Sequence, residues 1–128
     1  MALINTGADG DTARERLIGE TVAAPEIIDL EVVSVIRRQL LTGVINHWEA
    51  EFGLADLADL PLRRVSHRPL LRRIWDLHEN VTPYDGAYIA LAESLDVVLV
   101  TADVRLTRAP GTRCRFDLVR ARGRADGI

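Results

Sequence analysis

The chain has 128 residues, of which 48% are hydrophobic and 27% charged, and its formal net charge is −3. These values are typical of one folded globular domain, and they exclude a disordered polar chain and a strongly basic nucleic-acid-binding protein. No apolar run approaches the roughly 20 residues that cross a bilayer, and the N-terminus lacks the pattern of a signal peptide, so we expect a cytoplasmic protein.

Apolar spacing predicts four elements in the first half of the chain. Three segments repeat apolar residues with the period of a helix, and one short run of small and β-branched residues is typical of a buried strand. The predicted helices cover residues 11–20, 26–42 and 46–60, and the predicted strand covers residues 21–24. A proline or glycine directly follows the strand and the last two helices, which indicates where each ends.

The second half of the chain alternates strands with helices. The run VVLV, residues 97–100, is apolar without alternation, as in a parallel strand that is covered on both faces. Further strands are predicted over residues 62–66 and 113–119, and helices over residues 69–79, 84–95 and 101–108.

This alternation predicts an α/β fold, an open parallel sheet with helices on both faces. We expect a single domain over residues 1–119, followed by a loose basic tail over residues 120–128. Trp48 and Trp75 lie within predicted helices, and we expect both to pack in the core.

Three acids stand where the predicted helices begin or turn. Asp103 follows the VVLV strand at the entrance to a helix, so it is either an N-cap or a ligand at the carboxyl end of a strand. Asp85 begins a helix and fits either a favourable interaction with the helix dipole or a functional role. Glu31 has apolar neighbours within its helix, where a carboxylate needs a partner or a cation.

Acids gathered in one cleft repel one another unless a cation offsets their charge. Magnesium and manganese prefer such oxygen ligands and can activate water for attack on phosphorus. The three histidines lack the spacing of a metal motif, and no glycine-rich nucleotide motif occurs. The single cysteine, Cys114, excludes an internal disulfide and a zinc ribbon. These patterns favour a divalent-metal site built from acids.

Three blocks of the chain closely resemble the VapC toxins of the PIN-domain family, from about residue 25 to residue 118: APEIIDLEVVSVIRR, LLRRIWDLHENVTPYDGAYIALAESL and VVLVTADVRL. In that family four acids surround one or two divalent ions in a doubly wound fold. The resemblance implies that Glu31, Asp85 and Asp103 are catalytic residues and metal ligands, with Thr101 in support. It further implies a Mg²⁺- or Mn²⁺-dependent endoribonuclease that acts as the toxin of a toxin-antitoxin system.

One part of the family pattern is not recognisable in the chain. Family members open with a strand of the form V-V-D-[AT]-S, whose aspartate is the first acid. The opening MALINTGADGD matches instead the segment after that strand, so we expect the central strand to be missing and assign neither Asp9 nor Asp11 to its acid. Either the start lies too late or the protein is a decayed member, and the three surviving acids favour a late start. A sheet with such a gap would be less stable than a complete one.

The resemblance also implies partners: a cognate VapB-like antitoxin, an RNA substrate and a second copy in a homodimer, with no membrane. Arg105 and Arg108, near Asp103, are candidates for RNA contact, although solvated surface arginines explain them equally well. The region of Trp48 often forms an antitoxin groove in this family. With one acid missing, the alternative function is an impaired PIN module that only binds an antitoxin and represses with it.

Overall fold

The computed structural model describes residues 1–5 and 15–119. The predicted tail, 120–128, lies outside the described residues, as do residues 11–14 of the predicted helix over 11–20. Of its described part, residues 15 and 16 are helical and residues 17–19 form a turn. The described chain forms two compact units. We call residues 27–61 the helical unit and the rest the sheet unit. The assignment of one domain to residues 1–119 stays a prediction.

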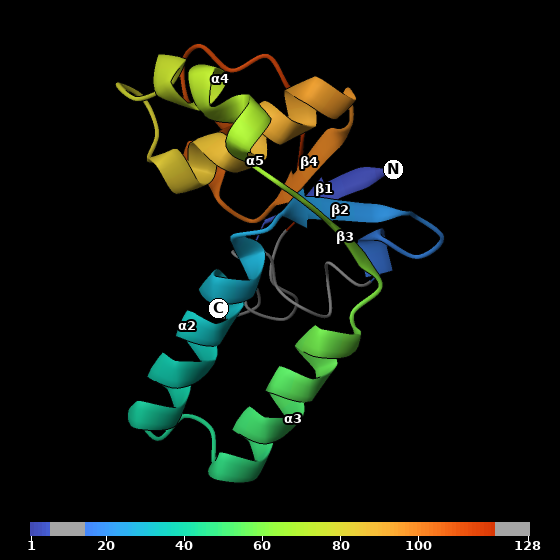
Figure 1. The fold of residues 1–128 in the computed structure, drawn as a ribbon, viewed down its shortest axis with the longest axis vertical. Coiled ribbons are helices and arrows are strands. Elements are labelled where there is room, and N and C mark those ends of the chain that lie inside the picture. Colours follow the sequence, from blue (N-terminus) through green and yellow to red (C-terminus); the bar gives the residue numbers. More distant parts are fainter. Residues whose placement is uncertain (6–14, 120–128) are drawn as a thin grey trace, which may run out of the picture. The chain divides into compact units, whose positions relative to one another are not determined.

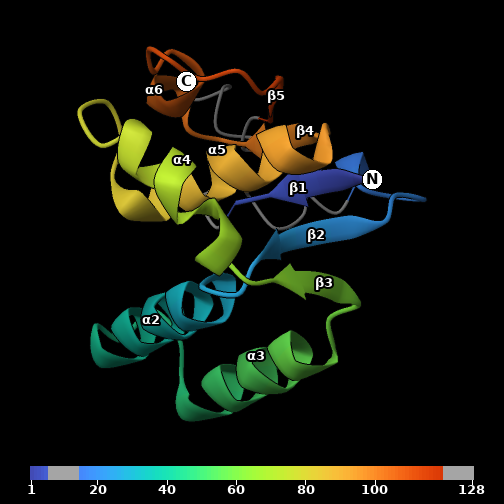
Figure 2. The same ribbon diagram turned by 45° about the horizontal axis from the view of Figure 1, so that its top comes forward.

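The sheet unit is built on five parallel strands (Figures 1 and 2). Their order is β3-β2-β1-β4-β5, which places β1 at the centre. The strands are β1 Ala2–Ile4, β2 Val22–Pro25, β3 Leu62–Val65, β4 Val98–Thr101 and β5 Phe116–Leu118. Leu3 is opposite Ala23 of β2 and Leu99 of β4, and all three side chains are fully buried. The α/β fold with a parallel sheet is therefore confirmed.

The expectation of a missing central strand is wrong. Residues 2–4 form that strand, and β2 and β4 both pair with it instead of facing a gap. The expected loss of stability from unpaired backbone groups therefore does not apply. The strand is short and its sequence, ALI, has too few residues to show a period, so pairing on both sides defines it.

Helices α4 and α5 of the sheet unit lie side by side, and α5 packs against β1, β2 and β4 (Figure 2). Helix α5, Pro83–Leu95, buries every residue from Gly86 to Ala92. Helix α4, Leu71–Asp76, follows a 3₁₀ turn, Arg68–Leu70. A Cβ atom on Gly86 would lie 3.3 Å from Cγ2 of Ile74, so glycine allows the close approach of the two helices. A short helix, α6 (Val104–Thr107), lies between β4 and β5.

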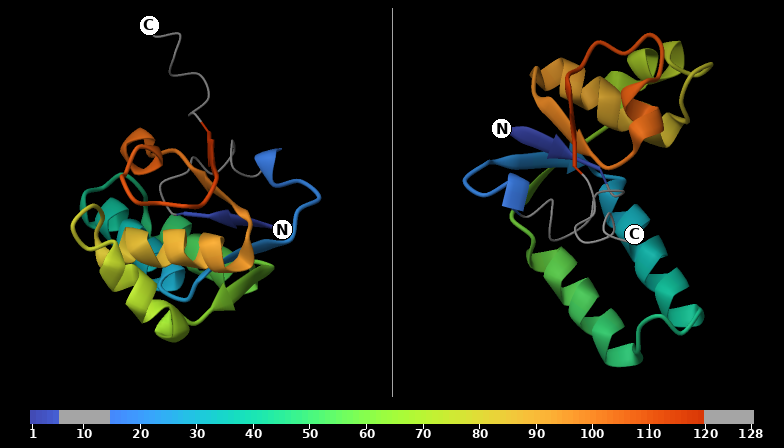
Figure 3. Two further views of the ribbon diagram at one scale, coloured as in Figure 1. Left: turned by 90° about the horizontal axis from the view of Figure 1, so that it is seen from above. Right: turned by 180° about the vertical axis from the view of Figure 1, so that it is seen from behind.

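The helical unit is a pair of helices, α2 Ile28–Leu41 and α3 His47–Asp59 (Figures 1 and 3). Asn46 caps α3: its side chain accepts a hydrogen bond from the backbone of Glu49, whose own side chain accepts one from the Asn46 backbone. Both predicted helices are confirmed.

The prediction that the tryptophans pack in the core is wrong. The side chain of Trp48 is 69% exposed, and that of Trp75 is 61% exposed. Each lies on an exposed side of its helix, and the helical period alone does not decide which apolar residues are covered. Both tryptophans are thus available for contact with another molecule.

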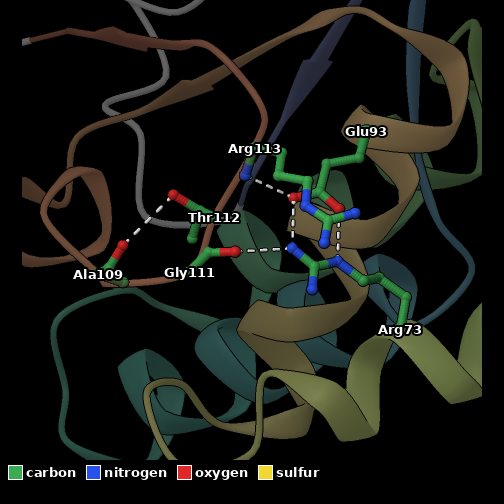
Figure 4. A network of polar contacts seen from close by, with 6 residues as sticks. All are labelled: Arg73, Glu93, Ala109, Gly111, Thr112 and Arg113. Atoms are coloured by element: carbon green, nitrogen blue, oxygen red, sulfur yellow. Dashed lines mark hydrogen bonds and ion pairs between the residues drawn. The ribbon is translucent and has the colours of Figure 1, made fainter.

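An ion pair inside the sheet unit joins α4 to α5 (Figure 4). The guanidinium of Arg73 donates hydrogen bonds of 2.7 and 3.1 Å to the two carboxylate oxygens of Glu93, and the backbone N–H of Arg113 donates a third of 2.7 Å. Arg73 also donates to the carbonyl oxygen of Gly111. Glu93 is thus a structural residue that joins α4, α5 and the segment before β5.

Within residues 1–5 and 15–119, none of the helices combines the length and the apolar character needed to span a bilayer.

Candidate active site at the carboxyl edge of the sheet

The strand order defines one point where the sheet changes direction. From β1 the chain continues to β2 on one side, and after β3 it crosses to β4 on the other side of β1. In open parallel sheets, ligands bind outside the carboxyl ends of the two strands that flank such a point. Here those ends carry Asn5, directly after β1, and Thr101, the last residue of β4.

Asn5, Thr101 and Asp103 form a chain of hydrogen bonds at this edge. The hydroxyl of Thr101 donates to Oδ1 of Asn5 over 3.1 Å and accepts from the backbone N–H of Asp103 over 3.1 Å. The backbone N–H of Asn5 donates to the carbonyl oxygen of Val100. Thr101 is fully buried and Asn5 is 7% exposed. The edge is therefore held by internal polar contacts, with Asp103 at its outer end.

Asp103 caps helix α6. Its Oδ1 accepts hydrogen bonds from the backbone N–H groups of Arg105, over 2.9 Å, and Leu106, over 3.4 Å. The N-cap interpretation is confirmed. Because the second carboxylate oxygen receives neither of these two bonds, capping leaves Asp103 an oxygen that can serve another role.

Asp85 lies in the first turn of α5, where the side chain of Thr82 accepts a hydrogen bond from its backbone N–H. Burial raises the pKa of the Asp85 carboxyl, and the negative charge of Asp103 raises it further. The Thr82 hydroxyl and the charge of Arg105 act in the opposite direction. The structure therefore brings two of the three predicted acids close enough to repel each other.

Asp85 and Asp103 line one pocket of about 690 Å³ in the sheet unit. Its walls come from the segment between α4 and α5, the start of α5, and α6 with the turn that follows it. Arg105 and Arg108, the predicted RNA contacts, also line it, and both are exposed. Two acids and two arginines therefore share this pocket.

Glu31, the third predicted acid, belongs to the helical unit. It lies in the first turn of α2 and is half-buried. Among the described residues, no three or more His, Cys, Asp or Glu side chains are grouped closely enough to hold a metal ion. The role of Glu31 stays a prediction.

Sequence reasoning missed Asn5. The residues Leu3, Ile4 and Asn5 of the opening MALIN occupy the strand and the position after it where the family pattern has V-V-D. The only signal in the sequence is a short apolar run followed by one polar residue, and a run of three residues is too short to predict the strand that places Asn5 at this edge. The switch point of the sheet thus carries a neutral amide in place of the carboxylate.

Comparisons with known proteins agree with this architecture. The sequence model of the PIN domain matches residues 1–111. Ribonuclease VapC1 of Mycobacterium tuberculosis is 41% identical over 120 residues, which cover 93% of this chain and 90% of that protein. Ribonuclease VapC12 of the same species is 38% identical over 119 residues, which cover 93% of this chain and 92% of that protein.

Solved structures show the same fold. PAE2754 from Pyrobaculum aerophilum superposes with a TM-score of 0.68 at 22% identity, covering 91% of this chain and 83% of that one. VapBC2 from Rickettsia felis, bound to a DNA fragment from its promoter, superposes with a TM-score of 0.67 at 13% identity. The match covers 93% of this chain and 99% of that one. A PIN fold with a pocket containing two acids is the class that the structure defines. The chain belongs to the PIN-domain family, and its relatives are ribonucleases of the VapC type.

Proposed function

We propose that the protein is the toxin of a type II toxin-antitoxin system, an endoribonuclease that depends on a divalent metal ion. The observation that carries this proposal is the pairing of Asp85 with Asp103 in one pocket of the sheet unit. Two neighbouring carboxylates that repel each other are a suitable pair of ligands for a cation. The identity to VapC ribonucleases over more than nine-tenths of the chain supports the same activity.

The donor set fits magnesium or manganese. Both ions prefer oxygen ligands, and magnesium commonly takes one or two carboxylates and completes its coordination with water. Asp85 and Asp103 would hold the ion, and we propose Glu31 as a third ligand. When bound, the ion supplies a Lewis acid that offsets negative charge on the phosphate.

The remaining residues orient the substrate and the acids. Thr101 fixes the backbone of Asp103 through its hydroxyl, so the position of that carboxylate depends on the end of β4. The guanidinium groups of Arg105 and Arg108 extend from the pocket wall and can pair with phosphates that flank the reacting one. Asn5 contributes a neutral oxygen at the centre of the edge.

We propose two protein partners. The Rickettsia felis structure is a VapBC2 complex bound to promoter DNA. By this likeness, a VapB-like antitoxin binds the present chain, and the exposed Trp48 and Phe52 of α3 offer it an apolar surface. A homodimer is proposed as the active form.

Replacement of Asp85 by asparagine tests the nuclease function. The variant keeps the side chain's size and removes its charge, so cleavage of single-stranded RNA in Mg²⁺ or Mn²⁺ should fall about 100-fold or more. Asp96→Asn is the matched control, because Asp96 ends the same helix outside the pocket in a left-handed conformation that asparagine tolerates. Equal cleavage by wild type and Asp85→Asn would refute the proposal.

Asn5 favours a second candidate function, a PIN module that binds an antitoxin and represses with it without cutting RNA. A neutral side chain at the switch point lowers the negative charge that a divalent ion would meet. The module is favoured if purified wild type binds its antitoxin but cuts no RNA with either metal.

A further inference from the structure

One feature on the rim of the pocket has no role in holding a metal ion. The rings of Trp75 and His78 are stacked, with their centroids 4.1 Å apart and their planes inclined by 6°. His78 lines the same pocket as Asp85 and Asp103, whereas Trp75 lies one helical turn earlier, in α4. The stacked pair therefore connects the pocket to the outer surface of the sheet unit.

The pair is held in place but remains open to solvent. Nδ1 of His78 lies 2.7 Å from the carbonyl oxygen of Trp75, a contact that restrains the imidazole. The side chain of Trp75 is nevertheless 61% exposed, and His78 is exposed too. A rigid aromatic surface of this size is costly to leave in water, which indicates that it contacts another molecule.

The chemistry around the pair indicates which molecule that is. Arg105, whose side chain is 95% exposed, and Arg108 supply cations that line the same pocket from α6 and its C-terminal end. An aromatic platform that shares a pocket with exposed guanidinium groups is a combination that binds single-stranded nucleic acid, in which the bases stack on the rings and the arginines pair with the phosphates. An apolar protein partner would make no use of these cations.

We propose that Trp75 and His78 form a stacking platform for an unpaired base of the RNA substrate, next to the phosphate that reaches the acids. This inference rests on the proposed ribonuclease function and adds to it a binding site for one unpaired base at the rim of the pocket. A base inside a duplex is covered by its neighbours and cannot stack on the platform without being flipped out. The pair is a binding element and takes no part in proton or metal chemistry.

Tryptophan fluorescence provides a direct test, because the chain contains only Trp48 and Trp75. In a Trp48→Phe background the emission comes from Trp75 alone. Titration with a single-stranded RNA 12-mer in EDTA, which withholds divalent ions, should quench this emission. A duplex of the same sequence should quench it much less. Unchanged emission on saturation with the single strand would overturn the proposal.

Affinity for the same 12-mer, measured by fluorescence anisotropy of a labelled strand, is the second readout. Stacking of one base contributes about 1–3 kcal/mol, so Trp75→Ala should bind about 5- to 150-fold more weakly, and Trp75→Phe should retain most of the affinity. Leu71→Ala, which truncates another exposed apolar residue of α4, should bind like wild type. Equal affinity of Trp75→Ala and wild type would also overturn the proposal.

Three further outcomes separate this proposal from its alternatives. If Trp75→Ala only turns a dimer into a monomer and keeps its RNA affinity per protomer, the pair is a self-association surface and the platform is refuted. If wild type cuts RNA in Mg²⁺ while Trp75→Ala has an unchanged KM, the stacking platform is refuted and the proposed ribonuclease function stands. If wild type neither binds nor cuts RNA, both the stacking platform and the proposed ribonuclease function are refuted.

Discussion

The hydroxyl of Thr101 donates a hydrogen bond of 3.1 Å to Oδ1 of Asn5, and so joins the carboxyl ends of the two central strands. Both side chains are buried at the switch point of the sheet. An aspartate in place of Asn5 could accept the same hydrogen bond, but it would add a negative charge to an edge that already holds Asp103. Several consequences of this geometry can be measured.

Asn5→Asp should lower the free energy of unfolding of the metal-free protein and raise its affinity for a metal ion. Without metal, a further buried charge near Asp103 should cost about 1–3 kcal/mol of unfolding free energy. With Mn²⁺ or Mg²⁺ the added carboxylate should raise the affinity about tenfold or more, because ligand charge sets affinity for hard cations. Thermal unfolding with and without metal, together with calorimetric titration, measures both effects.

The matched control for Asn5→Asp is Asn46→Asp, which adds the same charge at the N-cap of α3, where aspartate caps as well as asparagine. It should change neither metal affinity nor stability appreciably. A metal affinity of Asn5→Asp equal to that of wild type would show that the end of β1 does not face the ion.

Two substitutions of Asp103 should separate its capping role from its role in the pocket. Asn and Asp cap helices equally well, whereas alanine loses the cap at a cost of about 0.5–2 kcal/mol. We therefore expect Asp103→Asn to unfold at nearly the same urea concentration as wild type and Asp103→Ala to unfold earlier. Both should lose metal-dependent RNA cleavage. Retention of cleavage by Asp103→Asn would mean that the residue is a cap only.

The Glu93 carboxylate should increase the free energy of unfolding at neutral pH, and this contribution should be lost when the carboxylate is protonated in acid. Burial alone would raise the pKa of its carboxyl, but hydrogen bonds from Arg73 and from the Arg113 backbone, with the charges of both arginines, outweigh burial and lower it. A lowered pKa in the folded state means that the stabilisation is complete above the ordinary value of 4.5 and is lost as the pH falls through the folded-state pKa.

Urea unfolding of Glu93→Gln tests this pH dependence. At pH 7 the variant should be less stable than wild type by about 1–3 kcal/mol, because Arg73 is left without its charged partner. The difference should shrink as the pH falls below 4.5. A difference that stays constant down to the acid limit of folding would contradict the assignment of the ion pair.

Cys114 should react slowly while the protein is folded. The pKa of its thiol is raised from 9.0 to about 11, mainly by burial and to a smaller extent by the negative charge of Glu93. At pH 8 the reactive thiolate should therefore be about 100-fold rarer than in an unperturbed cysteine. Iodoacetamide labelling, followed by mass spectrometry, should be slow in buffer and fast in guanidinium. Fast labelling of the native protein would show that the thiol is accessible.

Much of the fold was predictable because the spacing of apolar residues along the chain has the period of a helix or a strand. The helix over residues 84–95 and the strand over residues 97–100 were predicted to within one or two residues of α5 and β4. Asp103 was assigned to a helix entrance on the same grounds. Each of these features depends on neighbours in sequence, which is the range over which propensity and capping act.

The features that were mispredicted depend on distant parts of the chain. The strand at residues 2–4 exists because Leu3 meets Ala23 and Leu99 on its two sides, and three residues carry no period of their own. The exposure of Trp75 likewise depends on which face of α4 packs against α5.

By itself, the sequence determined the order of helices and strands from residue 21 onward, the position of Asp85 and Asp103 at helix starts, and the family to which the chain belongs. Only the tertiary structure decided that β1 is central, that Asn5 occupies the switch point and that burial, together with the charge of Asp103, raises the pKa of Asp85. The reason is that backbone pairing and charge repulsion act through space between segments that local sequence patterns do not connect.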